Sequence, residues 1–567
     1  MIGTITMMTT TITIGTTTNW ERRTSVRVDQ LAIASAILLA SAAGLSSTAY
    51  ADERHGGSRP MACADLTGVK LSDTTITLAE LLPAGANPSP VGTLALPICR
   101  VVGVTKPAVA FEVWMPSAGW NGKFQLVGNG GTAGVISYGA MRTALTRGYA
   151  TASTDTGHVS SGSFDSTWAL GRPDLVADFG HRGTHVTAVN GKAVTRAYYG
   201  ERPKYSYYVG CSKGGQQGLM EAQRYPEDFD GLIAGDPANN WTSFYAGSHL
   251  WYSMATLKDP ESYIPASKTA ILGNATAAAC DAIDGIVDGV IDDPRKCKFD
   301  PAVLTCQAGQ DPATCYTPKQ VKAIKDIWSG VKAPWGEVVH PPLVPGAEGG
   351  AGGWAAWTTG AAPFTGLHWL AADGFFRYMV FENAGYNPMT YNFASDLLFS
   401  LAKVGPSLDA VDPDLRKLHK RGSKLIVYHG WSDPDISPLN TINYFESVVD
   451  FNARRHDERK EALERTQDFF RLFMAPGMQH CSGGPGPNSF DMLTALENWV
   501  EKGQAPKRII ASRVTAGVVD RTRPLCVYPK VAMYTGSGST DDAANFMCRT
   551  PREERNHGRH EDDDDDD

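Results

Sequence analysis

Two dipeptides constrain this chain of 567 residues more than any other feature. Cys211-Ser212 lies inside Gly210-Cys211-Ser212-Lys213-Gly214, and His480-Cys481 lies near the other end of the chain. The pentapeptide fits the pattern G-x-S-x-G, in which two glycines flank a serine held in a strained turn between a strand and a helix. If Cys211 and Cys481 are bridged, the disulfide ties the loop of the histidine to the turn of the serine.

The segments around Ser212 have the strand, turn and helix order that this pattern requires. Residues 205–209 are rich in β-forming side chains, and residues 216–225 have helical spacing. Further strand-like runs and helical patterns alternate along both halves of the chain, which predicts an α/β fold. The predicted strands are 109–115, 123–127, 149–154, 230–234, 424–428 and 469–474, and the further predicted helices are 184–199 and 490–500.

The middle of the chain has a different texture. Residues 239–392 are rich in Gly, Pro, Trp and Asp, and the α/β pattern returns after them. We interpret this block as a lid inserted in an α/β core. The predicted boundaries are a signal peptide region over 1–51, the first core part over 52–238, the lid over 239–395, the second core part over 396–550 and a disordered acidic tail over 551–567.

Three residues have the order of a serine-histidine-acid triad. A serine hydroxyl needs a base, and the base needs an acid that fixes its tautomer. Asp433 follows the predicted strand 424–428, and His480 follows the next one. Ser212, Asp433 and His480 therefore have the chain order of α/β-hydrolase triads. Asp435 is an alternative acid, and His429 is interpreted as structural.

An oxyanion needs backbone N–H donors. We expect one donor from Lys213, directly after the serine, and a second from Gly130 or Gly131, where glycine permits close backbone approach. A plain turn is the alternative interpretation of Gly130-Gly131.

The ten cysteines and the N-terminus suggest export. Arg22, Arg23 and Arg27 precede an apolar run over 31–45, and Ala49-Tyr50-Ala51 resembles a cleavage site, so we predict a secreted or periplasmic protein, with an uncleaved anchor as the alternative. An even cysteine count then favours disulfides. Proximity suggests pairing 63 with 99, 280 with 297, 306 with 315 and 526 with 548, leaving 211 and 481, although spacing alone does not establish the connectivity.

The net charge does not indicate a nucleic-acid partner. The formal charge is −8, and seven of the negative charges, Glu561 and Asp562–Asp567, belong to the C-terminal run. The rest of the chain is close to neutral and has no basic stripe.

Two parts of the predicted lid could bind ligands. The segment 280–292 concentrates aspartates between glycines, so Asp281, Asp284 and Asp288 side chains with Ile286 and Val290 carbonyls could bind Ca²⁺, while a solvated acidic turn is the alternative. Residues 351–372 lack Asp, Glu, Lys and Arg but contain aromatic side chains, which suit either a pocket for an aromatic acyl group or packing of the lid. The aromatics are Trp354, Trp357, Phe364 and Trp369, followed by Phe375, Phe376 and Tyr378.

Taken together, these motifs resemble the tannase and feruloyl esterase family of α/β-hydrolases. Cys211-Ser212, Asp433 and His480-Cys481 match the family's motifs, and the resemblance covers about 63–548. It implies an α/β-hydrolase core, a lid with a structural Ca²⁺ loop at the residues given above, and the five cysteine pairs. We predict Phe376, Arg377 and Ile436 as substrate-binding residues.

The resemblance implies an enzyme that cleaves small aromatic acyl esters through an acyl-enzyme. Hydroxycinnamate esters are the leading expectation, gallate esters the second, and terephthalate half-esters a further one. A non-catalytic binding protein with the same fold is the alternative from another class, because a fold does not determine a function. A peptidase is a weaker alternative. No nucleic acid or membrane partner is expected after removal of the signal peptide.

Overall fold

The computed structural model describes residues 59–89, 92–453 and 459–551. The predicted signal peptide region and nearly all of the predicted acidic tail lie outside the described residues. Within the described ranges, no helix is both long and apolar enough to cross a bilayer.

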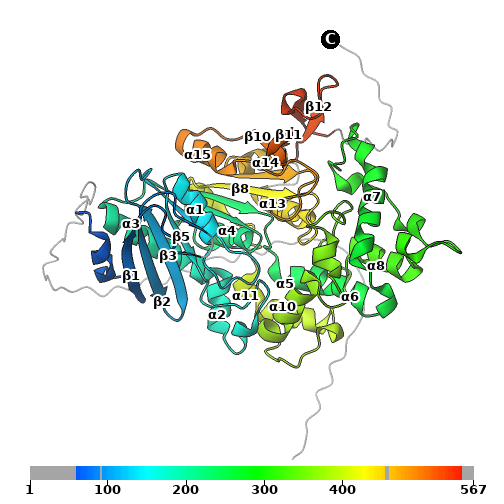
Figure 1. Cartoon of the computed structure of the whole chain (residues 1–567), viewed down its shortest axis with the longest axis horizontal. Helices are drawn as coiled ribbons and strands as arrows, with labels where there is room; N and C mark the ends of the chain where they lie inside the picture. The colour runs from blue at the N-terminus through cyan, green and yellow to red at the C-terminus, as the bar shows by residue number, and fades with distance from the viewer. Residues whose placement is uncertain (1–58, 90–91, 454–458, 552–567) are drawn as a thin grey trace, which may run out of the picture. The chain divides into compact units, whose positions relative to one another are not determined.

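A nine-stranded mixed sheet forms the centre of the fold (Figure 1). β1, β2, β3 and β5 are antiparallel neighbours, whereas β5, β4, β6, β7, β8 and β9 are parallel. In spatial order the strands are β1 (Thr74–Leu82), β2 (Ile98–Thr105), β3 (Val109–Pro116), β5 (Ala150–Thr154), β4 (Lys123–Val127), β6 (Tyr205–Cys211), β7 (Gly231–Gly235), β8 (Lys424–Gly430) and β9 (Phe470–Ala475).

Helices cover both faces of the sheet, so the central strands are buried on both sides. Along β8, Leu425 and Val427 pack into one hydrophobic cluster and Ile426 into the other. The first cluster includes α3 (Gly183–Tyr199), α4 (Lys213–Arg224) and α13 (Pro438–Asn452), and the second includes α1 (Tyr138–Thr146) and α15 (Met492–Lys502). Outside the segment between β7 and β8, the chain also forms the α-helices α2 (Pro173–Ala177) and α14 (Arg459–Gln467).

The chain between β7 and β8 adds no strand to the sheet in the described residues. It forms the green helices of Figure 1 and neighbouring turns, and its domain boundaries stay predictions. Its α-helices are α5 (Trp241–Phe244), α6 (Trp251–Leu257), α7 (Thr269–Cys280), α8 (Pro318–Ser329), α9 (Leu367–Gly374), α10 (Ser395–Lys403), α11 (Gly405–Leu408) and α12 (Arg416–Arg421).

The sequence patterns missed the outer strands β1 and β2 and two C-terminal hairpins. The edge strand β1 exposes Leu78 and Leu81, so it lacks the clean alternation that identifies a half-buried strand. The hairpins are β10 (Arg508–Thr515) with β11 (Val518–Cys526) and β12 (Val531–Tyr534) with β13 (Phe546–Arg549).

Candidate active site

Ser212 occupies a strained turn between β6 and α4. Its φ of 63° and ψ of −120° lie in a region that L-residues rarely adopt. The turn can close only because the flanking residues lack side chains: a Cβ at Gly210 would lie 2.6 Å from the Gly214 carbonyl oxygen. The Ser212 N–H donates to the Gly235 carbonyl at 2.9 Å, which ties the turn to the end of β7.

His480 and Asp433 form a hydrogen-bonded pair at the ends of β9 and β8. His480 Nδ1 lies 2.8 Å from Asp433 Oδ2, and Asp433 is fully buried. The other carboxylate oxygen accepts the backbone N–H groups of Asp435 at 2.8 Å and Ile436 at 3.0 Å. These bonds hold the carboxylate toward the Nδ1 side of the imidazole, so that Nε2 is the nitrogen that can act as a base.

Electrostatics favour the charged forms of this pair. Burial acts to raise the pKa of the Asp433 carboxyl, but His480, together with a hydrogen bond from His429, holds it below its usual range. Burial acts to lower the pKa of the His480 imidazole, but the charges of Asp433, Asp435 and Asp236 raise it above its usual range. The imidazolium that forms when His480 accepts a proton is therefore stabilised.

Asp435 lies on the opposite side of the imidazole. Its Oδ2 is 3.6 Å from His480 Nε2, and its Oδ1 accepts a hydrogen bond from His249 Nε2 at 2.7 Å. Burial raises the pKa of Asp435 to about 7. The sequence offered Asp435 as an alternative acid, but Asp433 is the carboxylate on Nδ1. His429 also touches Asp433, with its Nε2 3.2 Å from Oδ2.

The structure contains the four disulfides that sequence proximity suggested and a fifth between Cys211 and Cys481, the two cysteines that remained. Cys211–Cys481 joins residues 270 positions apart, with Cα atoms 6.0 Å apart. The bridge links the residue directly before Ser212 to the residue directly after His480. The other pairs are Cys63–Cys99, Cys280–Cys297, Cys306–Cys315 and Cys526–Cys548.

The glycine loop after β4 packs against the Ser212 turn. A Cβ at Gly128 would lie 2.7 Å from the Cα of Gly214. Asn129 and Gln217 exchange two hydrogen bonds of 3.0 Å, which ties the loop to α4. Gly131 has a φ of 57°, and a Cβ there would lie 2.2 Å from the Ser163 carbonyl oxygen. The loop that contains Gly130 and Gly131 is thus beside the helix that begins at Lys213.

Aromatic side chains of the inserted segment reach the histidine. The Trp357 ring is nearly perpendicular to the His480 ring, with centroids 5.3 Å apart. Phe376 and Ile436 are fully buried in one hydrophobic cluster. Arg377 instead donates to Asp373 at 2.6 Å and to the Ala384 carbonyl at 2.5 Å, so its guanidinium is already bonded within the protein.

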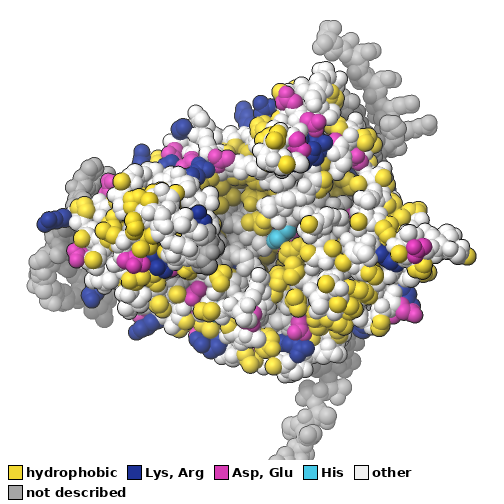
Figure 2. Space-filling view, viewed as in Figure 1, with side chains coloured by type: hydrophobic (Ala, Val, Ile, Leu, Met, Phe, Trp, Pro, Cys, Tyr) yellow, Lys and Arg dark blue, Asp and Glu magenta, His cyan; other side chains and the backbone are white. Residues whose placement is uncertain are grey.

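A cavity of about 550 Å³ lies next to the histidine loop. Gln479 and Ser482, which flank His480-Cys481, border it, but Ser212, His480 and Trp357 are not among its lining residues. In Figure 2, histidine colour shows in a hollow near the middle of the visible face, with hydrophobic side chains around it.

The acidic loop has calcium-type donors but does not draw its three aspartates together. Asp281 accepts the N–H groups of Asp288, Gly289 and Val290, and Asp288 Oδ2 pairs with Arg523 at 2.6 Å. Among the described residues, Asp281, Asp284 and Asp288 are not a group whose ligand atoms lie within 4.8 Å of one another.

Asp292 adds a carboxylate to this loop that the sequence interpretation did not assign. The residue is half-buried, and its buried Oδ1 has no hydrogen-bond partner in the described residues. Burial, with the nearby charge of Asp284, raises its pKa to about 8. A buried oxygen without a partner, with the carboxylates of Asp284 and Asp288 nearby, fits a hard cation.

The fold and this site define the chain as an α/β-hydrolase. Its sheet places a serine turn, an acid and a histidine at the ends of the parallel strands β6, β8 and β9, in the order that this class requires.

Comparisons with known proteins place the chain within that class. The family model for tannase and feruloyl esterase matches residues 92–549, and the chain belongs to this family of carboxylic ester hydrolases. An uncharacterized esterase from Xanthomonas campestris pv. campestris is 42% identical over 86% of this chain and 91% of its own length. A mono(2-hydroxyethyl) terephthalate hydrolase from Piscinibacter sakaiensis is 34% identical over 78% of this chain and 82% of its own.

A solved structure agrees with the fold. The crystal structure of feruloyl esterase B from Aspergillus oryzae is similar with a TM-score of 0.77 and 28% identity, covering 86% of this chain and 99% of that one.

Proposed function

We propose that this enzyme is a serine hydrolase of aromatic acyl esters that uses Ser212, His480 and Asp433. The observation that carries the proposal is the His480–Asp433 hydrogen bond, joined to the strained Ser212 turn by the disulfide between their neighbours. The sequence patterns assigned no role to Asp236, His249 or Asp292. Asp236 could have been found from its position, because it lies at the carboxyl end of a parallel strand, where α/β folds place their sites.

The proposed reaction has two steps. His480 Nε2 accepts the Ser212 hydroxyl proton while the serine oxygen attacks the ester carbonyl, and His480 then returns the proton to the departing alcohol. A water molecule next gives a proton to His480 and attacks the acyl-enzyme. His480 then returns this proton to the Ser212 oxygen as the acid leaves, which regenerates Ser212 and the neutral imidazole. Asp433 holds the imidazole by its Nδ1 and stabilises the imidazolium in both steps.

The negative oxygen of each tetrahedral intermediate needs donors that are already in place. We assign this role to the Lys213 N–H, at the start of α4, and to an N–H of Gly130 or Gly131. The support is the tight packing of the 128–131 loop against the helix, with Gln217 bonded to Asn129.

We propose hydroxycinnamate esters as the substrates, with gallate esters second. The support is the aromatic wall that Trp357 provides beside His480 and the similarity to feruloyl esterase B. Phe376 and Ile436, which are buried in one hydrophobic cluster, would contribute to the apolar side of the substrate pocket.

The 34% identity to the terephthalate half-ester hydrolase favours a second candidate substrate class. A half-ester presents a carboxylate, and a free arginine would suit it. Arg377 is bonded to Asp373, so it does not offer that charge. A comparison of kcat/KM on methyl ferulate, methyl gallate and mono(2-hydroxyethyl) terephthalate decides between the classes, and the highest value on the terephthalate ester would reject the hydroxycinnamate assignment.

We also propose that the enzyme is exported and that the acidic loop binds Ca²⁺. Five disulfides suit an oxidising compartment, which supports export.

In the proposed calcium site, Asp281, Asp284 and Asp288 with the carbonyls of Ile286 and Val290 would hold the ion, and Asp292 would add negative charge. A bound Ca²⁺ would supply structural cross-linking of the loop and no chemical step.

A fluorophosphonate probe tests the serine assignment directly, because it labels only an activated serine. We expect the wild type to be labelled and the Ser212→Ala variant to be unlabelled, with a loss of kcat of at least about 10⁴-fold and an unchanged Tm. Equal labelling of both proteins would reject Ser212 as the nucleophile.

A further inference from the structure

Asp236 is a buried carboxylate that the proposed reaction does not use. It directly follows β7, the strand that pairs with both β6 and β8. Its side chain is completely enclosed, and its φ of 35° is unusual for a residue with a side chain. Ser212 and Cys481 also have positive φ values, of 63° and 62°. Such strain persists only where the surrounding structure imposes it.

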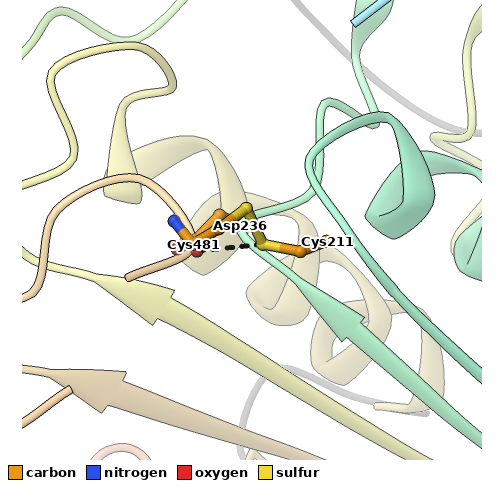
Figure 3. Close-up of side chains that lie close together, drawn as sticks. All are labelled: Cys211, Asp236 and Cys481. Atoms are coloured by element: carbon orange, nitrogen blue, oxygen red, sulfur yellow. Dashed lines mark hydrogen bonds between the residues drawn. A yellow bond between two sulfur atoms is a disulfide. The ribbon is translucent and has the colours of Figure 1, made fainter. Parts of the chain in front are cut away.

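The two oxygens of Asp236 accept backbone N–H groups from two different loops. Oδ1 accepts from Gly430 at 2.7 Å, and Oδ2 accepts from Cys481 at 2.8 Å. Oδ2 also lies 3.3 Å from the sulfur of Cys211, so the carboxylate sits beside the disulfide (Figure 3). The Asp236 N–H donates to the Tyr428 carbonyl at 2.9 Å, which orients the residue over the end of β8.

These contacts connect all three parts of the active site. Gly430 ends β8 and lies three residues before Asp433, Cys481 directly follows His480, and Cys211 directly precedes Ser212. The disulfide joins only the serine turn and the histidine loop. Asp236 adds the acid loop to that connection.

Among the residues that the structure describes, no lysine or arginine forms an ion pair with Asp236. The nearest basic side chain is His429, whose Nε2 is 3.7 Å from Oδ1. Burial raises the pKa of Asp236 to about 6, against the opposing effect of His429 and with a further rise from Asp433. The charged groups facing it are therefore His429, Asp433 and His480. A buried carboxylate held mainly by N–H groups costs stability, which points to a functional reason for its presence.

We propose that Asp236 is a positioning residue for ester hydrolysis: its carboxylate holds the His480 loop and the Asp433 loop in register with the Ser212 turn. This inference rests on the proposed function. Removing the carboxylate releases two loop N–H groups at once, and displacements of about 1 Å at a catalytic pair can cost on the order of 10²-fold in rate.

The test compares two substitutions at Asp236 with a matched control. Asp236→Asn keeps the size but presents an amide N–H₂ to one of the two N–H donors. Asp236→Gly removes the carboxylate and relieves the positive φ, so folding is favoured even if the asparagine variant is unstable. Asp409→Asn is the control, because Asp409 also accepts a backbone N–H, from Thr242 at 2.8 Å, and burial also raises its pKa to about 6.

We expect both Asp236 variants to lower kcat on methyl ferulate by about 10- to 100-fold while KM changes by less than about 2-fold. The Asp409→Asn variant should keep kcat near that of the wild type, with a Tm change similar to that of Asp236→Asn. A loss of kcat confined to the Asp236 variants at comparable Tm separates positioning from general destabilisation.

Three results would overturn the inference: folded Asp236 variants with kcat within about 2-fold of the wild type, an equal loss in Asp409→Asn, or failure of both Asp236 variants to fold while the control folds. Ser212→Ala, measured in parallel, keeps the two proposals apart. If that variant retained activity, the triad assignment would fail whatever the Asp236 variants do.

Discussion

The ends of the parallel strands and the acidic loop of the inserted segment both gather carboxylates, but only the first set is fully organised by the protein. Asp433 is bonded by two histidines and two backbone N–H groups. In the acidic loop, Asp288 forms an ion pair with Arg523, and the Oδ1 atom of Asp292 has no hydrogen-bond partner among the described residues. Strand ends are held in place by the hydrogen bonds of the sheet, whereas the acidic loop has no such framework in the described residues, and the Ca²⁺ that we propose would draw its oxygens together.

The largest effect should come from the acid on Nδ1 of the histidine. Asp433→Asn should lower kcat by about 10⁴-fold, because the amide stabilises the wrong tautomer of His480. Asp435→Asn should lower kcat by less than about 10-fold, because Asp435 contacts only the Nε2 side. Steady-state kinetics on methyl ferulate measure both. The reverse ranking would make Asp435 the catalytic acid.

The two regions should also differ in what their disulfides do. Cys211→Ser with Cys481→Ser should lower kcat by about 10- to 100-fold in enzyme that is still folded, because the bridge aligns the serine turn with the histidine loop. Cys280→Ser with Cys297→Ser, which opens a loop of 17 residues, should lower Tm with little change in kcat. Kinetics and thermal unfolding on both double variants provide the comparison, and a near wild-type kcat in the first would contradict it.

Calcium should matter for the acidic loop and not for the chemistry. Chelation should lower Tm by about 3 °C, because a ligand bound only to the folded state stabilises it, while kcat below the transition stays the same. In the Asp284→Asn variant the Tm should no longer depend on Ca²⁺. A wild-type Tm that is the same with chelator and with Ca²⁺ would reject the site.

The smallest effect should be a shift in the pH profile. The acid limb of kcat/KM reports the deprotonation of His480 in the free enzyme, and the negative charge of Asp435 raises the pKa of that imidazole. Removing the charge lowers this pKa, so Asp435→Asn should move the limb to lower pH by about one pH unit. A limb that stays in place or moves to higher pH would show that Asp435 does not act on His480.

The central strands of the sheet were predictable from sequence, because each is a short apolar run that is followed or preceded by a segment with helical spacing. The predicted runs 205–209 and 424–428 became β6 and β8, each two residues longer. Outer strands such as β1, with exposed apolar residues, carry no such pattern. Arg377 shows a second limit, because its ion pair with Asp373 is a contact that the sequence patterns did not reveal. Its role in substrate binding stays a prediction.

By itself, the sequence determined the chemical groups of this enzyme and their order: a serine in a glycine-flanked turn, then an acid, then a histidine, with cysteines beside the first and last. Local patterns suffice for this, because each turn is specified by the few residues around it. Only the tertiary structure decided that Asp433 rather than Asp435 bonds Nδ1 of His480, that Trp357 stands against that imidazole, and that Asp236 joins three loops. Those contacts join segments far apart in the chain, and the pairing of strand ends brings them together.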